Sequence, residues 1–324
     1  MGNLRTVFDP DRYHGFGQKP PFFEGWYYKL ISEDQESKYA VIPGIILGPN
    51  GHAFIQLLNG STGDSVYRTF SQESFTSSDN HFEIHIAGNS FTKDQISLNI
   101  NDQKGLVRGE LNFEGITPWP ISLTSPGIMG WYAWVPRMET YHGIVSLDHT
   151  IRGHLQVEDK EIDFNTGIGY IEKDWGVSFP EAYIWFQTNH FKQLNTSLTA
   201  SVAIIPWLRN AFRGFICGLW YKEHLYRFAT YTGAKIEKLK IFEDHIEWII
   251  RDKKLRLEMN ASRPEGGILL GPDRIEMGKR INETMSSTVE VRLSTLSGEE
   301  VFSEIGRHAG LEAHGDLERL RHLK

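Results

Sequence analysis

Short segments in which apolar and polar residues alternate, separated by turn signals, run through almost the whole chain. A period of two is the pattern of a strand with one buried face. Turns such as 49–51 (Pro-Asn-Gly) and 101–103 (Asn-Asp-Gln) supply the positive φ angles and side-chain hydrogen bonds that tight reversals need. Because the segments follow one another without helical spacers, the sequence predicts an all-β fold built from barrels or sandwiches.

Helical patterns are rare, and helices are expected only at residues 274–285 and 310–323. The strands are expected at residues 22–31, 40–47, 52–59, 81–87, 95–100, 106–114, 140–148, 153–158, 162–164, 168–174, 183–191, 197–205, 215–221, 225–232, 236–242, 245–251, 255–260 and 287–296.

The length of the chain sets the number of domains. At 324 residues it exceeds the size at which one hydrophobic core usually keeps growing. The strand pattern breaks near residues 175–180, between two comparable sets of strands. We therefore expect two domains, residues 1–178 and 179–324.

Charge, cysteine content and motif spacing exclude several classes of protein. The chain carries 34 Lys and Arg against 41 Asp and Glu, a formal net charge of −7, and has no long basic run, so no nucleic-acid partner is expected. Cys217 is the only cysteine, which excludes an internal disulfide and a cysteine-based zinc site. The spacing of His142, His149 and His154 matches no zinc motif, and phosphate-binding and dinucleotide loops are absent. We expect neither a metal nor a cofactor.

The N-terminal residues lack the apolar stretch of a secretory signal, and no apolar run approaches the roughly 20 residues of a membrane span. A cytoplasmic protein without a transmembrane segment is expected. The run 206–208 (Pro-Trp-Leu), followed by Phe212 and Phe215 and interrupted by Arg209 and Arg213, has two interpretations. It is either a loop that touches a membrane surface or a covered edge of a barrel.

Polar and aromatic side chains are concentrated between residues 168 and 191. An extended backbone over 168–174 places Tyr170, Glu172 and Asp174 on one face. Repulsion between the two carboxylates, together with burial, would raise the pKa of one of them and keep it protonated near neutral pH, as a general acid requires. Alternatively, Glu172 or Asp174 pairs with Lys173 or an arginine and fixes the turn between the domains.

The next expected strand has two contrasting faces. The residues of one face are apolar or small and are typical of a core: Ile184, Phe186 and Thr188. The other face mixes aromatic rings with amides: Tyr183, Trp185, Gln187, Asn189 and Phe191. Large apolar surface with a few orienting polar groups is typical of a small-molecule cavity. The alternative is that Gln187 and Asn189 satisfy backbone groups inside a barrel.

Near the N-terminus, Glu24, Trp26 and Tyr28 share one face of the strand expected at 22–31. A charged residue beside two aromatic rings indicates a lumen that holds a ligand. The alternative is that Trp26, which directly follows Gly25, closes the base of a barrel, as a Gly-Xaa-Trp motif does in lipocalins.

Five motifs in order resemble the tocopherol cyclase family. They are Phe-Glu-Gly-Trp-Tyr-Tyr-Lys at 23–29, Met129-Gly130 followed by Pro136 and Met138, His142 with Ser146, Gly-Tyr-Ile-Glu-Lys-Asp-Trp-Gly at 169–176 with Phe179-Pro180, and Trp-Phe-Gln-Thr-Asn-His-Phe at 185–191. The plant cyclases resemble Glu-Lys-Asn-Trp at the fourth motif, where this chain has a second carboxylate, Asp174.

The resemblance implies two tandem lipocalin-like antiparallel β-barrels with few short helices, in a superfamily that also holds carotenoid hydratases and cycloaddition enzymes. It implies closure of a prenylated quinol to a chromanol, without redox chemistry or a cofactor. In that reaction Glu172 or Asp174 would protonate the alkene, and aromatic rings would stabilise the cation. The expected ligand-binding residues are Glu24, Trp26, Tyr28, Tyr170, Trp175, Trp185, Gln187 and Asn189.

We therefore expect a cofactor-independent, acid-assisted cyclase or alkene hydratase that acts on a prenylated quinol or a similar hydrophobic molecule. The alternative is a non-catalytic barrel that uses the same aromatic lining to bind or carry such a molecule.

Overall fold

The computed structural model describes residues 9–136, 138–207, 210–274 and 276–323. The chain divides into two compact units. Unit 1 consists of Met1–Phe179 and Leu269–Arg280, and unit 2 consists of Pro180–Ile268 and Ile281–Lys324. The predicted all-β class is confirmed, because the described residues form two large antiparallel sheets and one short α-helix, α2 (Leu317–His322).

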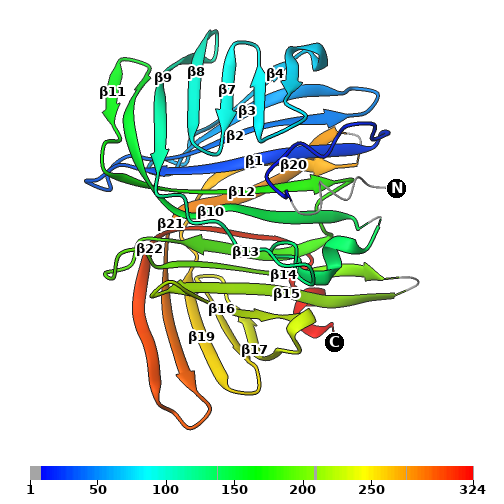
Figure 1. Ribbon diagram of the computed structural model, residues 1–324, viewed down its shortest axis with the longest axis vertical. Helices are drawn as coiled ribbons and strands as arrows, with labels where there is room; N and C mark the ends of the chain where they lie inside the picture. The colour runs from blue at the N-terminus through cyan, green and yellow to red at the C-terminus, as the bar shows by residue number, and fades with distance from the viewer. Residues whose placement is uncertain (1–8, 137, 208–209, 275, 324) are drawn as a thin grey trace. The chain divides into compact units, whose positions relative to one another are not determined.

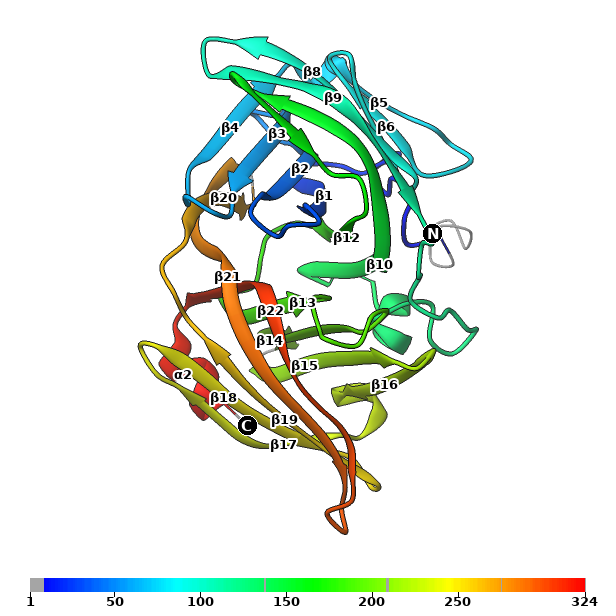
Figure 2. The same cartoon turned by 90° about the vertical axis from the view of Figure 1, so that its left-hand side faces the viewer.

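Unit 1 is built on a twelve-stranded antiparallel sheet. Figure 1 shows β1, β12 and β10 side by side at its centre, and Figure 2 shows how strongly β10 bends. The pairing path among the described strands ends at β4 and β5 rather than closing. In order the strands are β4 (Ser65–Phe70), β3 (His52–Asn59), β2 (Lys38–Leu47), β1 (Phe22–Ile31), β12 (Gly167–Gly176), β10 (Thr140–Val157), β9 (Gly105–Glu114), β8 (Gln95–Asp102), β7 (Asn89–Thr92), β6 (Glu83–Ile86) and β5 (Phe75–Ser77), with β11 (Lys160–Asp163) paired to β10.

One face of this sheet encloses the core of unit 1. Aromatic and β-branched residues favour strands because they pack well on a pleated surface, and six of the ten residues of β1 are of this kind. Its alternate residues Phe22, Trp26, Tyr28 and Leu30 all enter the core. The intervening residues of β1 project from the opposite face, as the period of two requires.

Unit 2 contains most of a ten-stranded antiparallel sheet with its own core. In order the strands are β16 (His224–Ala229), β15 (Asn210–Tyr221), β14 (Ser197–Trp207), β13 (Ala182–Thr188), β22 (Glu300–Gly315), β21 (Glu276–Thr295), β19 (Leu255–Ser262), β18 (His245–Arg251) and β17 (Lys235–Ile241), with β20 (Gly267–Asp273) paired to β21. Three 3₁₀ turns complete the described elements: η1 (Gln72–Ser74), η2 (Gly130–Trp134) and η3 (Thr230–Thr232).

The hairpin tip of β20 and β21 belongs to unit 1. There the Gln56 amide forms two hydrogen bonds with the backbone of Leu270, donating to its carbonyl at 3.2 Å and accepting from its N–H at 2.8 Å. The Lys279 ammonium donates to the Ser178 hydroxyl at 3.2 Å. These hydrogen bonds join the segment to Gln56 and Ser178 of unit 1, although it lies far from the rest of the unit in the sequence.

Both predicted helices require correction. Residues 276–285 are strand in β21. Ile281 and Met285 are both buried and lie four apart, a spacing that suits one face of a strand as well as one face of a helix. Residues 310–315 complete β22, and the helix is limited to Leu317–His322. The sequence also did not predict β4, β5, β7, β20 or β22 as strands, and it divided β10 into two.

Candidate active site

Alternation along β12 places Tyr170, Glu172 and Asp174 on one face, as predicted. This face is opposite to the core of unit 1, where Ile171 lies. The strand is held between β1 and β10. Pairing with β10 brings His142 directly beside Asp174.

His142 lies between the two carboxylates of β12. Its Nδ1 is 2.8 Å from Oδ1 of Asp174, and its Nε2 is 3.6 Å from Oε2 of Glu172. The Tyr170 hydroxyl donates to the same Glu172 oxygen at 2.5 Å. Tyr170 and Glu172 are buried, whereas the side chain of Asp174 is 26% exposed. We call Tyr170, His142, Glu172 and Asp174 the β12 acid cluster.

The carboxylates control the protonation of His142. Burial disfavours the charged ring and lowers its pKa, but the charges of Asp174 and Glu172 outweigh burial and raise the pKa to about 9. At neutral pH the ring is therefore an imidazolium held between two acidic side chains. The cluster contains a stored proton, two carboxylates and a phenol, which are the components of general acid–base catalysis.

Lys173 does not pair with a neighbouring carboxylate of β12, which was the alternative expected from the sequence. Lys173 projects from the opposite face of the strand and pairs with Glu24 of β1. The partner of Asp174 is His142, which the sequence indicated only through a family motif and through a histidine spacing that matches no zinc motif. Its role depends on the pairing of β10 with β12, and 32 residues separate it from Asp174 along the chain.

The same residues are the ones that could hold a cation. His142, Glu172 and Asp174 each offer a ligand atom, and these atoms lie within 4.8 Å of one another. Histidine spacing along the sequence did not suggest this group, because its members come from two strands. Nδ1 of His142 is hydrogen-bonded to Asp174, whereas Nε2, 3.6 Å from Glu172, is buried without a hydrogen-bond partner among the described residues.

The ligand-binding residues expected on β1 lie on the core side of the sheet. Trp26 is fully buried, stacks on Phe82 and donates from Nε1 to the Asp11 carbonyl at 3.1 Å. Tyr28 is also fully buried, and its hydroxyl donates to a backbone carbonyl at 2.8 Å. Glu24 is paired with Lys173 on this side. These three residues and the β12 acid cluster therefore occupy opposite faces of one sheet.

Trp175 also lies on the core side. Its ring stacks on His14 with centroids 4.1 Å apart and on Tyr141 with centroids 5.5 Å apart. It alternates with Asp174 along β12, so its ring is directed away from the face that carries the acid cluster.

In unit 2, Ile184 and Phe186 of β13 enter the core, as predicted. Trp185 and Gln187 project from the other face of the strand and are buried there. The prediction that Phe191 shares this face is wrong, because β13 ends at Thr188 and the alternation ends with it. Phe191 packs in the core against Phe302.

Sequence reasoning missed two acidic residues near Trp185. Glu312 of β22 pairs with Trp185 across the strands and accepts a hydrogen bond from Tyr183 at 2.6 Å. Glu283 of β21 is the cross-strand neighbour of Glu312 and is fully buried. Both lie in segments that were not predicted to be strands. Asn189 follows the end of β13, and its side-chain oxygen is 3.1 Å from His190 Nδ1.

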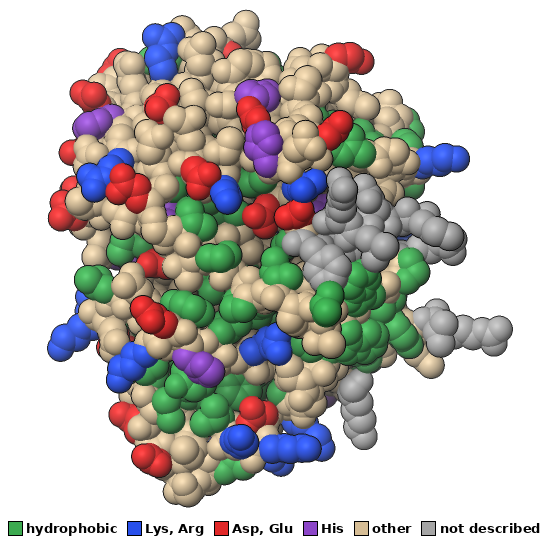
Figure 3. All heavy atoms as spheres, viewed as in Figure 1, with side chains coloured by type: hydrophobic (Ala, Val, Ile, Leu, Met, Phe, Trp, Pro, Cys, Tyr) green, Lys and Arg blue, Asp and Glu red, His purple; other side chains and the backbone are tan. Residues whose placement is uncertain are grey.

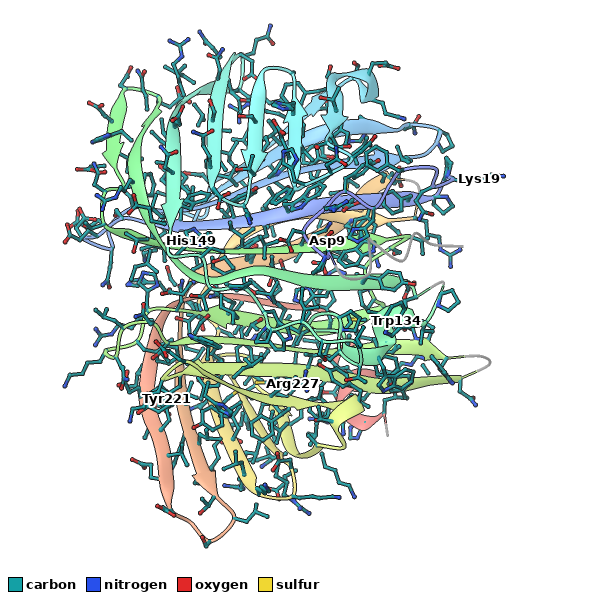
Figure 4. All side chains as sticks on the ribbon, in the orientation of Figure 1. Asp9, Lys19, Trp134, His149, Tyr221 and Arg227 are labelled. Atoms are coloured by element: carbon teal, nitrogen blue, oxygen red, sulfur yellow. The ribbon has the colours of Figure 1, made fainter. Side chains whose placement is uncertain are left out.

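His149 of β10 is buried, and the sequence considered it only as a zinc ligand (Figure 4). Its Nδ1 is 3.0 Å from the Ser146 hydroxyl, and burial lowers its pKa to about 3. His149 is thus neutral where His142 is charged. A Cβ at Gly169 would lie 2.2 Å from His149 Nε2, so glycine makes room for the ring.

The run considered for membrane contact is described in part. Leu208 and Arg209 lie outside the described residues, Trp207 is 38% exposed, and Phe215 is buried in the core of unit 2. Acidic and basic side chains are interspersed over the face shown in Figure 3.

Among the residues that the structure describes, no helix has the length and apolar character needed to span a membrane.

Residues 98–315 match the family model described as tocopherol cyclase-like. The chain belongs to the tocopherol cyclase-like family. The chloroplastic tocopherol cyclase of Zea mays is 25% identical to it over 155 residues, which are 46% of this chain and 32% of the maize protein. This member of the family therefore spans about a third of the length of the curated relative that it matches.

Solved structures share the fold of this tocopherol cyclase-like chain. CghA, crystallised with Sch210972, aligns with a TM-score of 0.56 and 12% identity over 92% of this chain and 89% of CghA. Kievitone hydratase from Nectria haematococca aligns with a TM-score of 0.52 and 12% identity over 94% of each chain. At this identity the likeness shows the fold alone, and it agrees with the predicted fold class.

Proposed function

We propose that this chain is a cofactor-independent enzyme that protonates an alkene in a prenylated quinol or a similar hydrophobic substrate, leading to cyclisation or hydration. The observation that carries the proposal is the His142 imidazole placed between Asp174 and Glu172. Membership of a cyclase-like family and the fold shared with an enzyme named a hydratase support this class of reaction.

Each member of the β12 acid cluster has a separate task in the proposed reaction. The His142 imidazolium passes its Nε2 proton to Glu172, and Glu172 delivers that proton to one alkene carbon as the π electrons of the double bond form the new C–H bond. The Tyr170 hydroxyl, which donates to Glu172, stabilises the carboxylate that remains. The proton that the nucleophile later loses to the cluster restores the His142 imidazolium, and Asp174 orients the ring through Nδ1.

The carbocation that forms is consumed by an oxygen nucleophile. In cyclisation the phenol oxygen of the substrate bonds to the cation and loses its proton to the cluster, so the product is an isomer of the substrate. In hydration a water oxygen takes the same role and the product gains one water. Neither route needs an oxidant or a reductant. Trp185, Gln187 and Asn189 are proposed ligand-binding residues of unit 2, on the basis of their aromatic and amide chemistry.

The test is an incubation with a prenylated benzoquinol in D₂O, with chromanol and hydrated product followed by mass spectrometry. Acid-assisted closure places one deuteron on carbon, and a parallel run in ¹⁸O-water labels only the hydration product. Loss of a general acid typically lowers turnover about 10²- to 10⁴-fold, and this is the effect expected for Glu172→Gln.

Asp174→Asn is expected to have a smaller effect, because the asparagine still reaches His142. The control is His154→Gln, which removes an exposed histidine of β10, the strand that carries His142. Equal turnover in the wild type and Glu172→Gln would show that Glu172 is not the general acid. Saturable binding of the quinol without turnover, across several prenyl substrates, would favour the carrier alternative.

A further inference from the structure

The gap between His142 and Glu172 in the β12 acid cluster has the width of a bound metal ion. Nε2 of His142 is 3.6 Å from Oε2 of Glu172, which is too long for a hydrogen bond. Imidazole nitrogens and carboxylate oxygens lie about 2.0–2.2 Å from Zn²⁺, so two such ligand atoms at tetrahedral angles are roughly 3.4 Å apart. A small movement of either side chain therefore brings both atoms within reach of one ion.

Asp174 determines which nitrogen of His142 faces this gap. A carboxylate only accepts hydrogen bonds, so Nδ1, 2.8 Å from Oδ1 of Asp174, carries a proton. Nε2 is buried without a hydrogen-bond partner among the described residues, and it is the nitrogen that can exchange its proton for a metal. A carboxylate that accepts from the second ring nitrogen is the usual outer-shell partner of a metal-binding histidine. Asp174 therefore orients the ring as a metal site requires.

The carboxylate of Glu172 is held in place as well. The Tyr170 hydroxyl donates to its Oε2 at 2.5 Å, and the pairing of β10 with β12 fixes the backbone of both ligands. Ligands on regular strands are positioned more precisely than ligands on loops. The side chain of Asp174 is 26% exposed, so the cluster opens to solvent and an ion from solution can reach it.

The charges of the cluster select a divalent ion. Glu172 and Asp174 carry two negative charges, and a neutral imidazole adds none, so a dication neutralises the group. Buried charges are stable only when they are paired in this way. Imidazole nitrogen is a good ligand for Zn²⁺, Cu²⁺ and Ni²⁺, whereas Mg²⁺ and Ca²⁺ prefer sites built from oxygen alone. The donor set therefore favours a transition-metal ion.

A second group of histidines and a carboxylate, on the surface of unit 1, shows the difference. Nε2 of His81 and Nε2 of His85 lie 2.7 and 2.9 Å from the two oxygens of Glu83, so both nitrogens are already hydrogen-bonded. The two histidine side chains are 64% and 47% exposed. Among the described residues, the β12 acid cluster alone places three ligand atoms from different side chains within 4.8 Å of one another.

We propose that the β12 acid cluster binds one Zn²⁺ ion or a similar divalent transition-metal ion. His142 Nε2 and the Glu172 carboxylate are the ligands, Asp174 holds the other ring nitrogen, and water completes the coordination. The ion takes the position of the Nε2 proton, so it inhibits proton delivery by the cluster. The site goes beyond the proposed function: binding of the ion is independent of the reaction, and only the inhibition rests on it.

The test is a calorimetric titration of the full chain with ZnCl₂, after metal has been removed with EDTA and the EDTA dialysed away. The wild type is expected to bind one Zn²⁺ saturably at the cluster. His142→Gln removes the ligand nitrogen and is expected to abolish this binding. Asp174→Asn is expected to weaken it about 10- to 100-fold, which is the usual effect of losing an outer-shell partner.

His85→Gln is the matched control, because it removes a histidine of the surface group and is expected to leave Zn²⁺ binding at the cluster unchanged. Urea unfolding without metal shows which variants retain the fold, and Asp174→Asn, at a partly exposed position, keeps the test decisive where His142→Gln does not fold. No saturable binding to the wild type, unchanged binding in either cluster variant, or equal losses in His142→Gln and His85→Gln would overturn the proposal.

Turnover separates this inference from the proposed function. Zn²⁺ is expected to stop conversion of the prenylated benzoquinol, and EDTA to restore it, because the ion occupies the nitrogen that supplies the proton. Zn²⁺ bound at His142 with undiminished turnover would remove His142 from the proposed reaction and leave the metal site established.

Discussion

The ammonium group of Lys173 and the carboxylate of Glu24 form an ion pair in which neither side chain has exposed surface. Removing two charges from water is costly, and the cost is offset only when other polar groups complete the site. The Lys173 ammonium also lies 4.7 and 4.8 Å from the ring centroids of Trp26 and Trp175. Burial alone would raise the pKa of Glu24, but Lys173 and His14 hold it below its ordinary value.

Lys173→Met is expected to destabilise unit 1 strongly, because it leaves the Glu24 carboxylate buried without its cation. Breaking one side of a buried pair typically costs about 3–5 kcal/mol. Urea unfolding measures the loss, and the double variant Lys173→Met with Glu24→Gln is expected to recover part of it. Arg152→Met is the control, because Arg152 and its partner Glu114 are each 55% exposed and such pairs contribute about 0–1 kcal/mol. Similar losses in Lys173→Met and Arg152→Met would contradict the expected importance of the buried pair.

The sequence predicted the faces of single strands well and the contacts between strands poorly. Alternation alone placed Glu172 and Asp174 together and separated them from Lys173, and the bounds of β1 were predicted correctly. The partners of these residues were not predictable in this way. Glu24 is 149 residues from Lys173, and pairing of β1 with β12 brings them together.

Periodicity also failed where two periods coincide. Ile281 and Met285 lie in a segment predicted as helix, and their spacing fits both a helix and the strand β21 that pairs with β22. Glu283 of β21 and Glu312 of β22 were missed because both lie in segments that were predicted to be helices. Alternation correctly assigned Ile184 to the core, whereas Phe191 was assigned to the wrong face because the end of β13 could not be located from the sequence.

The stability provided by His142 is expected to decline at alkaline pH. Its folded pKa, about 9, lies above the ordinary value of 6.5, so its contribution is fully present below pH 6.5 and is lost as the pH rises through 9. The difference corresponds to about 3 kcal/mol at about 1.4 kcal/mol per pKa unit. Urea unfolding of the wild type and His142→Gln on both sides of this window measures it, with His154→Gln as the control. A wild-type advantage that stays constant from pH 6 to pH 10 would show that the carboxylates do not hold the proton on His142.

Gly169→Ala is expected to destabilise the chain because the new methyl group would clash with His149. The His149 ring has little room to move, since it is bonded to Ser146 and its centroid lies 4.5 Å from that of Phe113. Overpacking of this kind typically costs about 1–3 kcal/mol. In the double variant with His149→Ala the ring is absent. The stability lost in the double variant should therefore be smaller than the sum of the losses in the two single variants of the double-mutant cycle.

Gly25→Ala is the matched control for this cycle. It changes a glycine of the neighbouring strand β1 where the nearest atom to an added Cβ is 3.6 Å away, an ordinary contact. Unfolding by urea is expected to be nearly unchanged in Gly25→Ala. Strict additivity of Gly169→Ala and His149→Ala would show that the clash is not with the histidine.

Tyr170→Phe is expected to slow the proposed reaction with little effect on the overall fold. The Tyr170 hydroxyl donates to Glu172 at 2.5 Å, and a hydrogen bond to a charged group contributes about 1.5–3 kcal/mol. If the bond stabilises the Glu172 carboxylate after proton transfer, its loss should lower kcat about 10- to 100-fold and leave KM nearly unchanged. Tyr67→Phe, which removes a hydroxyl 2.7 Å from His52 on the strands β3 and β4, is the control and should retain full kcat. A raised KM with unchanged kcat in Tyr170→Phe would instead assign Tyr170 to substrate binding, and equal kinetics in both variants would remove it from the mechanism.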